Sequence, residues 1–158
     1  MAAIRPMSRL LFSRSLQTTA RRGYADQMNF TFAAGNQVFY NAMSVKQVDV
    51  PSFSGSFGIL PAHVPTLAVL KPGVVTVYED SGKVNKIFVS SGTVTINDDS
   101  SVQILAEEAH PVENLDVNAA RDIRTKAQSQ LSSAGTDQAR AEAAIAIEVG
   151  EALVKAAE

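Results

Sequence analysis

The spacing of apolar residues changes near Pro111, and this change divides the chain into two kinds of structure. Before Pro111, apolar and polar residues alternate in short runs separated by glycine, proline and aspartate. Alternation with period two places one side of a strand on a core and the other side in water. After Pro111, apolar residues recur about every four positions, as on one face of a helix. The sequence therefore predicts a β domain over residues 25–112 and an α-helical hairpin over residues 113–158.

The β domain begins with an alternating run in which Met28, Phe30 and Phe32 fall on one side. Turn signals then recur about every 8–12 residues, which leaves room for one short strand between successive turns. These intervals are too short for the crossover helices that a parallel sheet requires. We therefore expect an antiparallel β-sandwich, or a flattened barrel, of about 8–10 strands.

The stretch Gly55–Pro65 combines two glycines and two prolines with large apolar side chains. Proline fixes φ and lacks an N–H, so it marks a turn or a sheet edge rather than a central strand. We expect a rigid, shaped loop held between strands. One of the two histidines of the chain, His63, lies between the prolines, and the other is His110.

The first helix is predicted from apolar residues at four-residue steps. These residues are Leu115, Ala119, Ile123, Ala127 and Leu131. Asn114 or Asp116 is placed to cap the start of this helix, and Gly135 is expected to end it in a left-handed conformation.

The second helix, which Thr136 or Asp137 can cap, is rich in alanine. Ala139, Ala146 and Ala152 are expected to let the two helices approach closely. Ile145 and Ile147 lie about 200° apart around a helix, so both cannot face the first helix. One of them must meet the sandwich or another protein.

Positive charge is concentrated in residues 1–24, which hold five arginines and no acid. This segment, in which Ile4, Leu11 and Leu16 share one side of a helix, is typical of a mitochondrial transit peptide. We expect cleavage between Tyr24 and Ala25; a basic tail without a targeting role is the alternative.

The rest of the chain is acidic. Of the 14 Lys and Arg residues in the whole sequence, five lie in residues 1–24, so nine remain beside 16 Asp and Glu residues. An acidic body argues against a nucleic-acid partner, which requires a basic surface. No later segment approaches the roughly 20 apolar residues of a membrane span, so we expect none.

The sequence shows no constellation of catalytic residues. The two histidines are isolated, there is no cysteine, and no glycine-rich phosphate loop precedes a helix. Adjacent acids such as Glu107 and Glu108 point to opposite faces of a strand. We therefore expect no catalytic residue, no metal and no cofactor. A small hydrolase with His63 as its base, or a nucleotide sensor that uses the hairpin, are the alternatives.

Several motifs, taken in order, resemble one family. They are Val48-Asp49-Val50-Pro51, Gly55–Pro65, Lys71-Pro72-Gly73, Val89-Ser90-Ser91-Gly92, Leu105-Ala106-Glu107-Glu108-Ala109 and Glu151-Ala152-Leu153-Val154-Lys155-Ala156. Over residues 25–158 the chain resembles the delta subunits of the mitochondrial F-type ATP synthase, which are the counterparts of the bacterial and chloroplast epsilon subunits.

The resemblance implies a β-sandwich followed by a two-helix hairpin. It also implies a non-catalytic subunit of the central stalk, on the matrix side of the inner mitochondrial membrane. Such a subunit couples proton-driven rotation of the ring of c subunits to the gamma subunit, and so to ATP synthesis in the catalytic head. Its implied partners are gamma, the small mitochondrial epsilon subunit and the c ring.

The resemblance also assigns surfaces by position. Gly55, Ser56 and Phe57 are expected to face the c ring. Pro61, His63 and Val64 are expected to lie near gamma.

Two positions depart from the bacterial pattern. Ser56 stands where bacterial chains often carry an acid, and Ala119 stands where an ATP-binding motif on the hairpin carries arginine. Because that phosphate partner is missing, we expect no regulatory ATP site.

Overall fold

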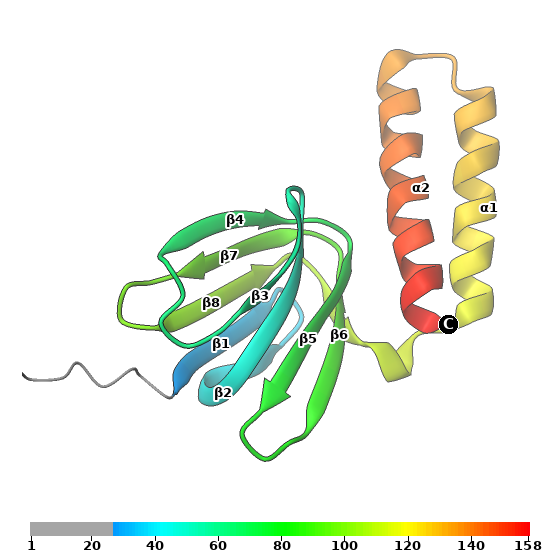
Figure 1. Ribbon diagram of the computed structural model, residues 1–158. Helices are drawn as coiled ribbons and strands as arrows, with labels where there is room; N and C mark the ends of the chain where they lie inside the picture. Colours follow the sequence, from blue (N-terminus) through cyan, green and yellow to red (C-terminus); the bar gives the residue numbers. More distant parts are fainter. Residues whose placement is uncertain (1–26) are drawn as a thin grey trace, which may run out of the picture.

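The computed structural model describes residues 27–158. The predicted transit peptide and its cleavage site between Tyr24 and Ala25 lie outside these residues. Within them, a nine-stranded β part is followed by two α-helices (Figure 1). The strands are β1 (Met28–Ala34), β2 (Val38–Ser52), β3 (Gly55–Ile59), β4 (Thr66–Leu70), β5 (Gly73–Glu79), β6 (Val84–Val89), β7 (Gly92–Ile96), β8 (Ser101–Ala106) and β9 (Ala109–Pro111).

The strands form two layers in the order β1-β8-β7-β4-β2-β5-β6-β9, with β3 paired to β2 (Figure 1). The long strand β2 pairs with β1 along its first part and with β3 and β5 along its second part. Every pairing is antiparallel except that between β1 and β8. This parallel pair needs no direct crossover, because β1 and β8 are far apart in the chain. The predicted fold class, a β-sandwich followed by a helical hairpin, is confirmed.

The core lies between the two layers, where the apolar faces of the strands meet. Phe30 and Phe32 of β1 are fully buried, as the alternation predicts. Their rings pack at centroid distances of 5.2 Å from Tyr40 and 5.1 Å from Phe39, respectively. Burial of each such aromatic side chain contributes about 1.5–3 kcal/mol to the free energy of unfolding.

The prediction that all of Gly55–Pro65 is a loop is wrong, because Gly55–Ile59 forms strand β3. Pro51 lies inside β2 in register with Ser56, and its carbonyl still accepts a hydrogen bond from the Lys71 N–H at 3.2 Å. The proline therefore does not end the strand. Gly58 leaves room for a neighbouring side chain, since a Cβ there would lie 2.8 Å from Asp49 Oδ1.

The C-terminal part consists of a 3₁₀ turn, η1 (Val112–Asn114), and the helices α1 (Val117–Ser133) and α2 (Asp137–Ala157). Asp116 caps α1, because its Oδ1 accepts hydrogen bonds from the N–H groups of Asn118 and Ala119 at 2.8 and 3.3 Å. Thr136 caps α2 by accepting from the Ala139 N–H at 3.1 Å. Each cap is one of the two alternatives that the sequence offers.

The predicted stripe on α1 is partly wrong. Ala127 is buried as expected, but Ala119 is exposed and Ile123 is 45% exposed, while Ala120 is buried instead. Four residues turn a helix by about 400°, so a stripe with constant four-residue steps rotates away from its partner. Mixed steps of three and four residues keep one face toward α2. Gly135 is also not left-handed, and Ala134 ends α1 with an extended backbone.

The two helices approach closely at Gly150, a position that the sequence did not single out. A Cβ on Gly150 would lie 3.0 Å from the Arg124 Cα, so glycine allows the two backbones to pass. The predicted contact residues Ala139, Ala146 and Ala152 are only half-buried.

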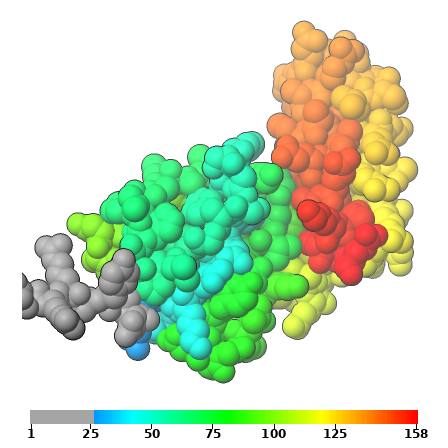
Figure 2. Space-filling view, viewed as in Figure 1, coloured from blue at the N-terminus to red at the C-terminus, as the bar shows by residue number. Residues whose placement is uncertain are grey.

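Helix α2 lies between α1 and the sandwich (Figure 1), and the space-filling view shows the hairpin standing beside the sandwich, in contact near its base (Figure 2). Ile145, which is 63% exposed, lines a cavity on the sandwich side together with Phe53 and Val69. Ile147 is half-buried. Of the two isoleucines, Ile145 is therefore the one turned toward the sandwich.

A substitution at Gly92 tests the packing of the sandwich. Gly92 has a φ of 155°, and a Cβ there would lie 2.2 Å from the Leu105 carbonyl oxygen. We expect Gly92→Ala to lower the free energy of unfolding by about 2–4 kcal/mol, measured by denaturant unfolding. Gly135→Ala is the matched control, because nothing lies within 4 Å of its added Cβ. Equal stability of the two variants would contradict the packing of β7 against β8.

Candidate functional site

The tip between β2 and β3 presents an aromatic side chain to solvent. Phe53 is 70% exposed, yet its N–H donates to the Val69 carbonyl at 3.3 Å. The buried Ser52 accepts a hydrogen bond from the Ser54 N–H at 3.2 Å and pairs with the Ser54 hydroxyl at 2.8 Å. The backbone of the tip is thus tied to β4 and to itself, while the Phe53 ring projects outward.

The three residues predicted for the ring-facing surface differ in exposure. Gly55 and Ser56 are exposed next to the tip, whereas Phe57 is half-buried and packs against the core. The Phe57 ring lies 6.1 Å from the His63 ring, centroid to centroid. Sequence reasoning missed Phe53; its position in a Ser-Phe-Ser-Gly turn, where an apolar side chain has no strand face to join, is the signal that was available.

The connection from β3 to β4, residues 60–65, forms a second exposed surface. Val64 is 72% exposed, and Pro61 and His63 are half-buried beside it. The His63 ring nitrogen Nδ1 donates to the Val64 carbonyl at 2.8 Å, which fixes the ring over its own loop. This loop follows the opposite end of β3 from the β2–β3 tip (Figure 1).

An apolar patch continues from this loop over the outer face of β4 and β8. It consists of Leu67, Val69 and Leu105, of which Leu67 is 73% exposed. Thr93 of β7 lies between Val69 and Leu105 in the strand register. Contiguous exposed apolar surface usually marks a contact with another protein. The available signal was the unbroken run Leu67–Leu70, since a strand covered on both faces does not alternate.

Two cavities separate α2 from the sandwich on either side of Pro72, with volumes of about 450 and 620 Å³. The larger holds Phe53 and Ile145 and is bordered by Glu107, Glu108 and Glu148. The hairpin is therefore in contact with the sandwich without being tightly packed against it.

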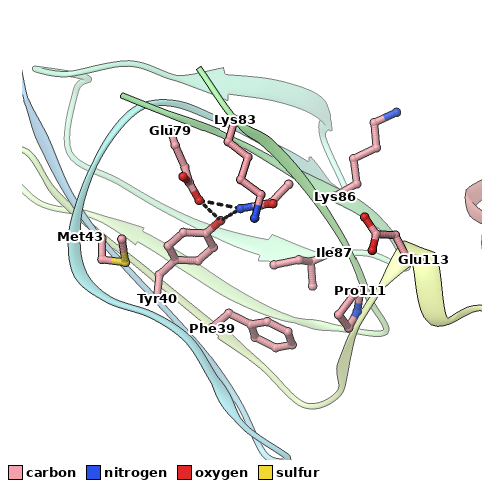
Figure 3. A pocket seen from close by; sticks show the side chains of 10 residues that line it. Phe39, Tyr40, Met43, Glu79, Lys83, Lys86, Ile87, Pro111 and Glu113 are labelled. Carbon is pink, nitrogen blue, oxygen red and sulfur yellow. Dashed lines mark hydrogen bonds between the residues drawn. The ribbon is translucent and has the colours of Figure 1, made fainter. Parts of the chain in front are cut away.

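A further cavity of about 370 Å³ lies beside the β5–β6 hairpin (Figure 3). At its edge, Asn85 Nδ2 donates to Glu79 Oε1 at 2.7 Å and to the Tyr40 hydroxyl oxygen, and that hydroxyl donates to Glu79 at 3.2 Å. Burial, followed by the charge of Glu79, raises the pKa of Tyr40 above its usual value. These groups satisfy one another, so the network ties β5 and β6 to β2 and provides no free acid or base.

The described residues offer little for catalysis. Among residues 27–158, no group of His, Cys, Asp and Glu is placed to hold a metal ion. The His63 ring hydrogen-bonds to the Val64 carbonyl, so within residues 27–158 this histidine is not paired with a serine as a triad requires. In the same part of the chain, no helix is long and apolar enough to cross a membrane.

Comparison with known families matches both parts of the chain. Residues 27–112 match the family described as ATP synthase, Delta/Epsilon chain, beta-sandwich domain. Residues 115–156 match the C-terminal domain described as that of the metazoan delta subunit of F1F0-ATP synthase. The chain therefore belongs to the delta/epsilon chain family of the ATP synthase.

Similar proteins within that family are mitochondrial delta subunits. ATP synthase subunit delta of Caenorhabditis elegans is 45% identical, over 93% of this chain and 98% of that protein. The Yarrowia lipolytica subunit is 41% identical over 85% of each chain. The predicted resemblance is thus confirmed, and it is to the mitochondrial delta branch of the family.

Solved structures share the fold. A chain of the Euglena gracilis mitochondrial ATP synthase superposes with a TM-score of 0.80 at 24% identity, covering 93% of this chain and 91% of that one. A chain of the Tetrahymena thermophila enzyme gives a TM-score of 0.62 at 15% identity, covering 83% of this chain and 96% of that one.

Two phenylalanines near the tip provide a test of which side chain is available to a partner. Because Phe57 packs against the core, we expect Phe57→Asp to lower the free energy of unfolding by about 2–4 kcal/mol. Phe53→Asp, at an exposed position, should change it by no more than about 0.5 kcal/mol. Denaturant unfolding of both variants measures the difference. Loss of stability in Phe53→Asp with none in Phe57→Asp would reverse the assignment.

Proposed function

We propose that this chain acts as a non-catalytic rotor subunit in the central stalk of the mitochondrial proton-transporting ATP synthase. The observation that carries the proposal is the similarity to mitochondrial delta subunits over nearly the whole length of both proteins. The subunit works on the matrix side of the inner membrane, and its partners are gamma, the small mitochondrial epsilon subunit and the c ring. It couples proton-driven rotation of the c ring to gamma and so to ATP synthesis in the catalytic head.

The geometry of β3 supports this coupling role. The strand has five residues, which span about 17 Å at the usual rise per residue. The β2–β3 tip precedes it and the Leu60–Pro65 loop follows it. A partner at each end would therefore be joined by one strand that β2 holds along its length.

The c-ring contact is proposed for the end of the strand that carries the tip. Gly55 and Ser56 are exposed there, and Phe53 adds an aromatic ring that is 70% exposed. Phe57 supports the strand from the core side, and its ring lies 6.1 Å from the His63 ring. Ser56 carries no charge, so the contact with the c ring at this position would consist of polar and apolar contacts rather than an ion pair.

The gamma contact is proposed for the other end. Pro61, His63 and Val64 form a loop whose apolar surface continues into Leu67. Burial of such a continuous patch against a partner removes apolar surface from water, and this is the main source of affinity in a stable interface.

We further propose that ATP does not regulate this subunit. Ala119 is exposed on the first turn of α1, and its methyl group offers neither charge nor hydrogen bond to a phosphate. A saturable rise in melting temperature at millimolar ATP would favour the nucleotide-sensor alternative.

Recovery of partners tests the proposed function. A tagged chain purified from mitochondria in mild detergent should bring down gamma, the small epsilon subunit and the c ring together. Recovery of the folded chain without any of these subunits would contradict the proposal.

The hydrolase alternative is tested on the isolated protein. We expect no ATP hydrolysis by the purified chain. Turnover that Val64→Ala preserves and His63→Ala abolishes would favour a catalytic role for His63 over the coupling role.

A further inference from the structure

Two segments that are far apart in the chain meet at the end of the sandwich away from the helices. One is the Leu60–Pro65 loop, and the other is the turn between β7 and β8, residues 97–100 (Figure 1). They are joined by a hydrogen bond in which the Ala62 N–H donates to the Ser100 Oγ at 3.2 Å, across 38 residues of sequence. Ser100 is one of only two polar residues recorded as buried within residues 27–158.

Both partners of this bond have a left-handed backbone. The φ angles are 61° for Ala62 and 65° for Ser100, and within residues 27–158 only one other non-glycine residue, Ala42, has a positive φ. Such a conformation is unfavourable for a residue with a Cβ, and it persists where the surrounding structure holds it in place. Two of these rare conformations are thus hydrogen-bonded to each other.

The turn that carries Ser100 is fixed by its own hydrogen bonds. The Asn97 N–H donates to the Ser101 carbonyl at 2.9 Å, and Asn97 Nδ2 donates to the Ser101 hydroxyl at 2.8 Å. The Ser101 N–H in turn donates to Asp99 Oδ1 at 2.9 Å, and the bonds from Ser101 lower the pKa of the Asp99 carboxyl. Ser100 is therefore presented on a turn that does not depend on the loop.

The loop, by contrast, has only short-range hydrogen bonds of its own. The His63 N–H donates to the Leu60 carbonyl at 3.1 Å, and the Thr66 hydroxyl donates to the Val64 carbonyl at 2.8 Å. Neither bond fixes the loop relative to the rest of the sandwich. The bond to Ser100 does, because it connects Ala62, the residue just before His63, to the β7–β8 turn.

We propose that Ser100 is a positioning residue whose hydroxyl holds the Leu60–Pro65 loop in the shape that contacts gamma. This inference rests on the proposed assignment of His63 and Val64 to the gamma interface. A loop that is already in its bound shape loses less conformational freedom on association, so the bond would increase affinity without touching the partner.

Ser100→Gly is the informative variant, because glycine adopts the left-handed backbone without strain and the substitution removes the hydroxymethyl side chain that accepts the bond from Ala62. In the isolated full chain, hydrogen–deuterium exchange of the Ala62 amide should accelerate by about 2- to 12-fold, the range expected for loss of one hydrogen bond. Ser81→Ala is the matched control, since it removes a serine hydroxyl from another hairpin turn, where that hydroxyl bonds Glu79 and the Lys83 N–H and not the Leu60–Pro65 loop or the β7–β8 turn. Its Ala62 exchange should stay within about twofold of the unsubstituted chain, below the effect of a lost bond.

The affinity for purified gamma distinguishes a positioning role of Ser100 from a purely structural one, because a purely structural role would leave this affinity unchanged. Ser100→Gly should weaken binding by up to about tenfold, since the loop is in the binding shape for a smaller fraction of the time, while Ser81→Ala should leave the affinity unchanged. Unaltered Ala62 exchange in Ser100→Gly, or faster exchange with full gamma affinity, would overturn the positioning role. Absence of gamma binding by the unsubstituted chain would instead contradict the proposed function, and the exchange measurement would still decide whether the bond holds the loop.

Discussion

The pairing of β2 with its neighbours is the interaction on which the rest of the structure depends. This 15-residue strand pairs with β1, β3 and β5, and at Ser52 it also pairs with Leu70 of β4. It is therefore the element that both layers share. The register that β2 imposes places Phe57 toward the core and leaves Ser56 outward, so one ladder of backbone hydrogen bonds decides which side chains are packed and which are available to partners.

The stiffness of this arrangement has a functional meaning for a rotor subunit. A β-ladder resists shear because neighbouring strands are joined by repeated hydrogen bonds. The tip and the Leu60–Pro65 loop add long-range bonds of their own, from Phe53 to Val69 and from Ala62 to Ser100. The hairpin is attached differently, with cavities along α2 where it faces the sandwich. The sandwich is accordingly the part suited to transmit torque.

Much of the fold could be predicted from periodicity, and the failures have identifiable causes. Alternation located β1 and most later strands, and cap chemistry offered Asp116 and Thr136. Gly55–Ile59 was mistaken for a loop because glycine and proline signal turns locally, whereas pairing with β2 overrides that signal. Ile123 was placed on the buried face because a constant four-residue step ignores the helical drift. The candidate surfaces were assigned from the family resemblance. The exposure of Phe53 and Leu67 could not be predicted, because it depends on strand register, which is set by residues far apart in the chain.

We propose that the two ends of β3 contact different subunits of the rotor. Site-specific photo-cross-linking in the assembled ATP synthase tests it most directly, with a photoreactive amino acid placed at position 56 or at position 64. We expect position 56 to cross-link to the c subunit and position 64 to cross-link to gamma. Cross-links from both positions to the same subunit, or from neither position to any rotor subunit, would contradict it.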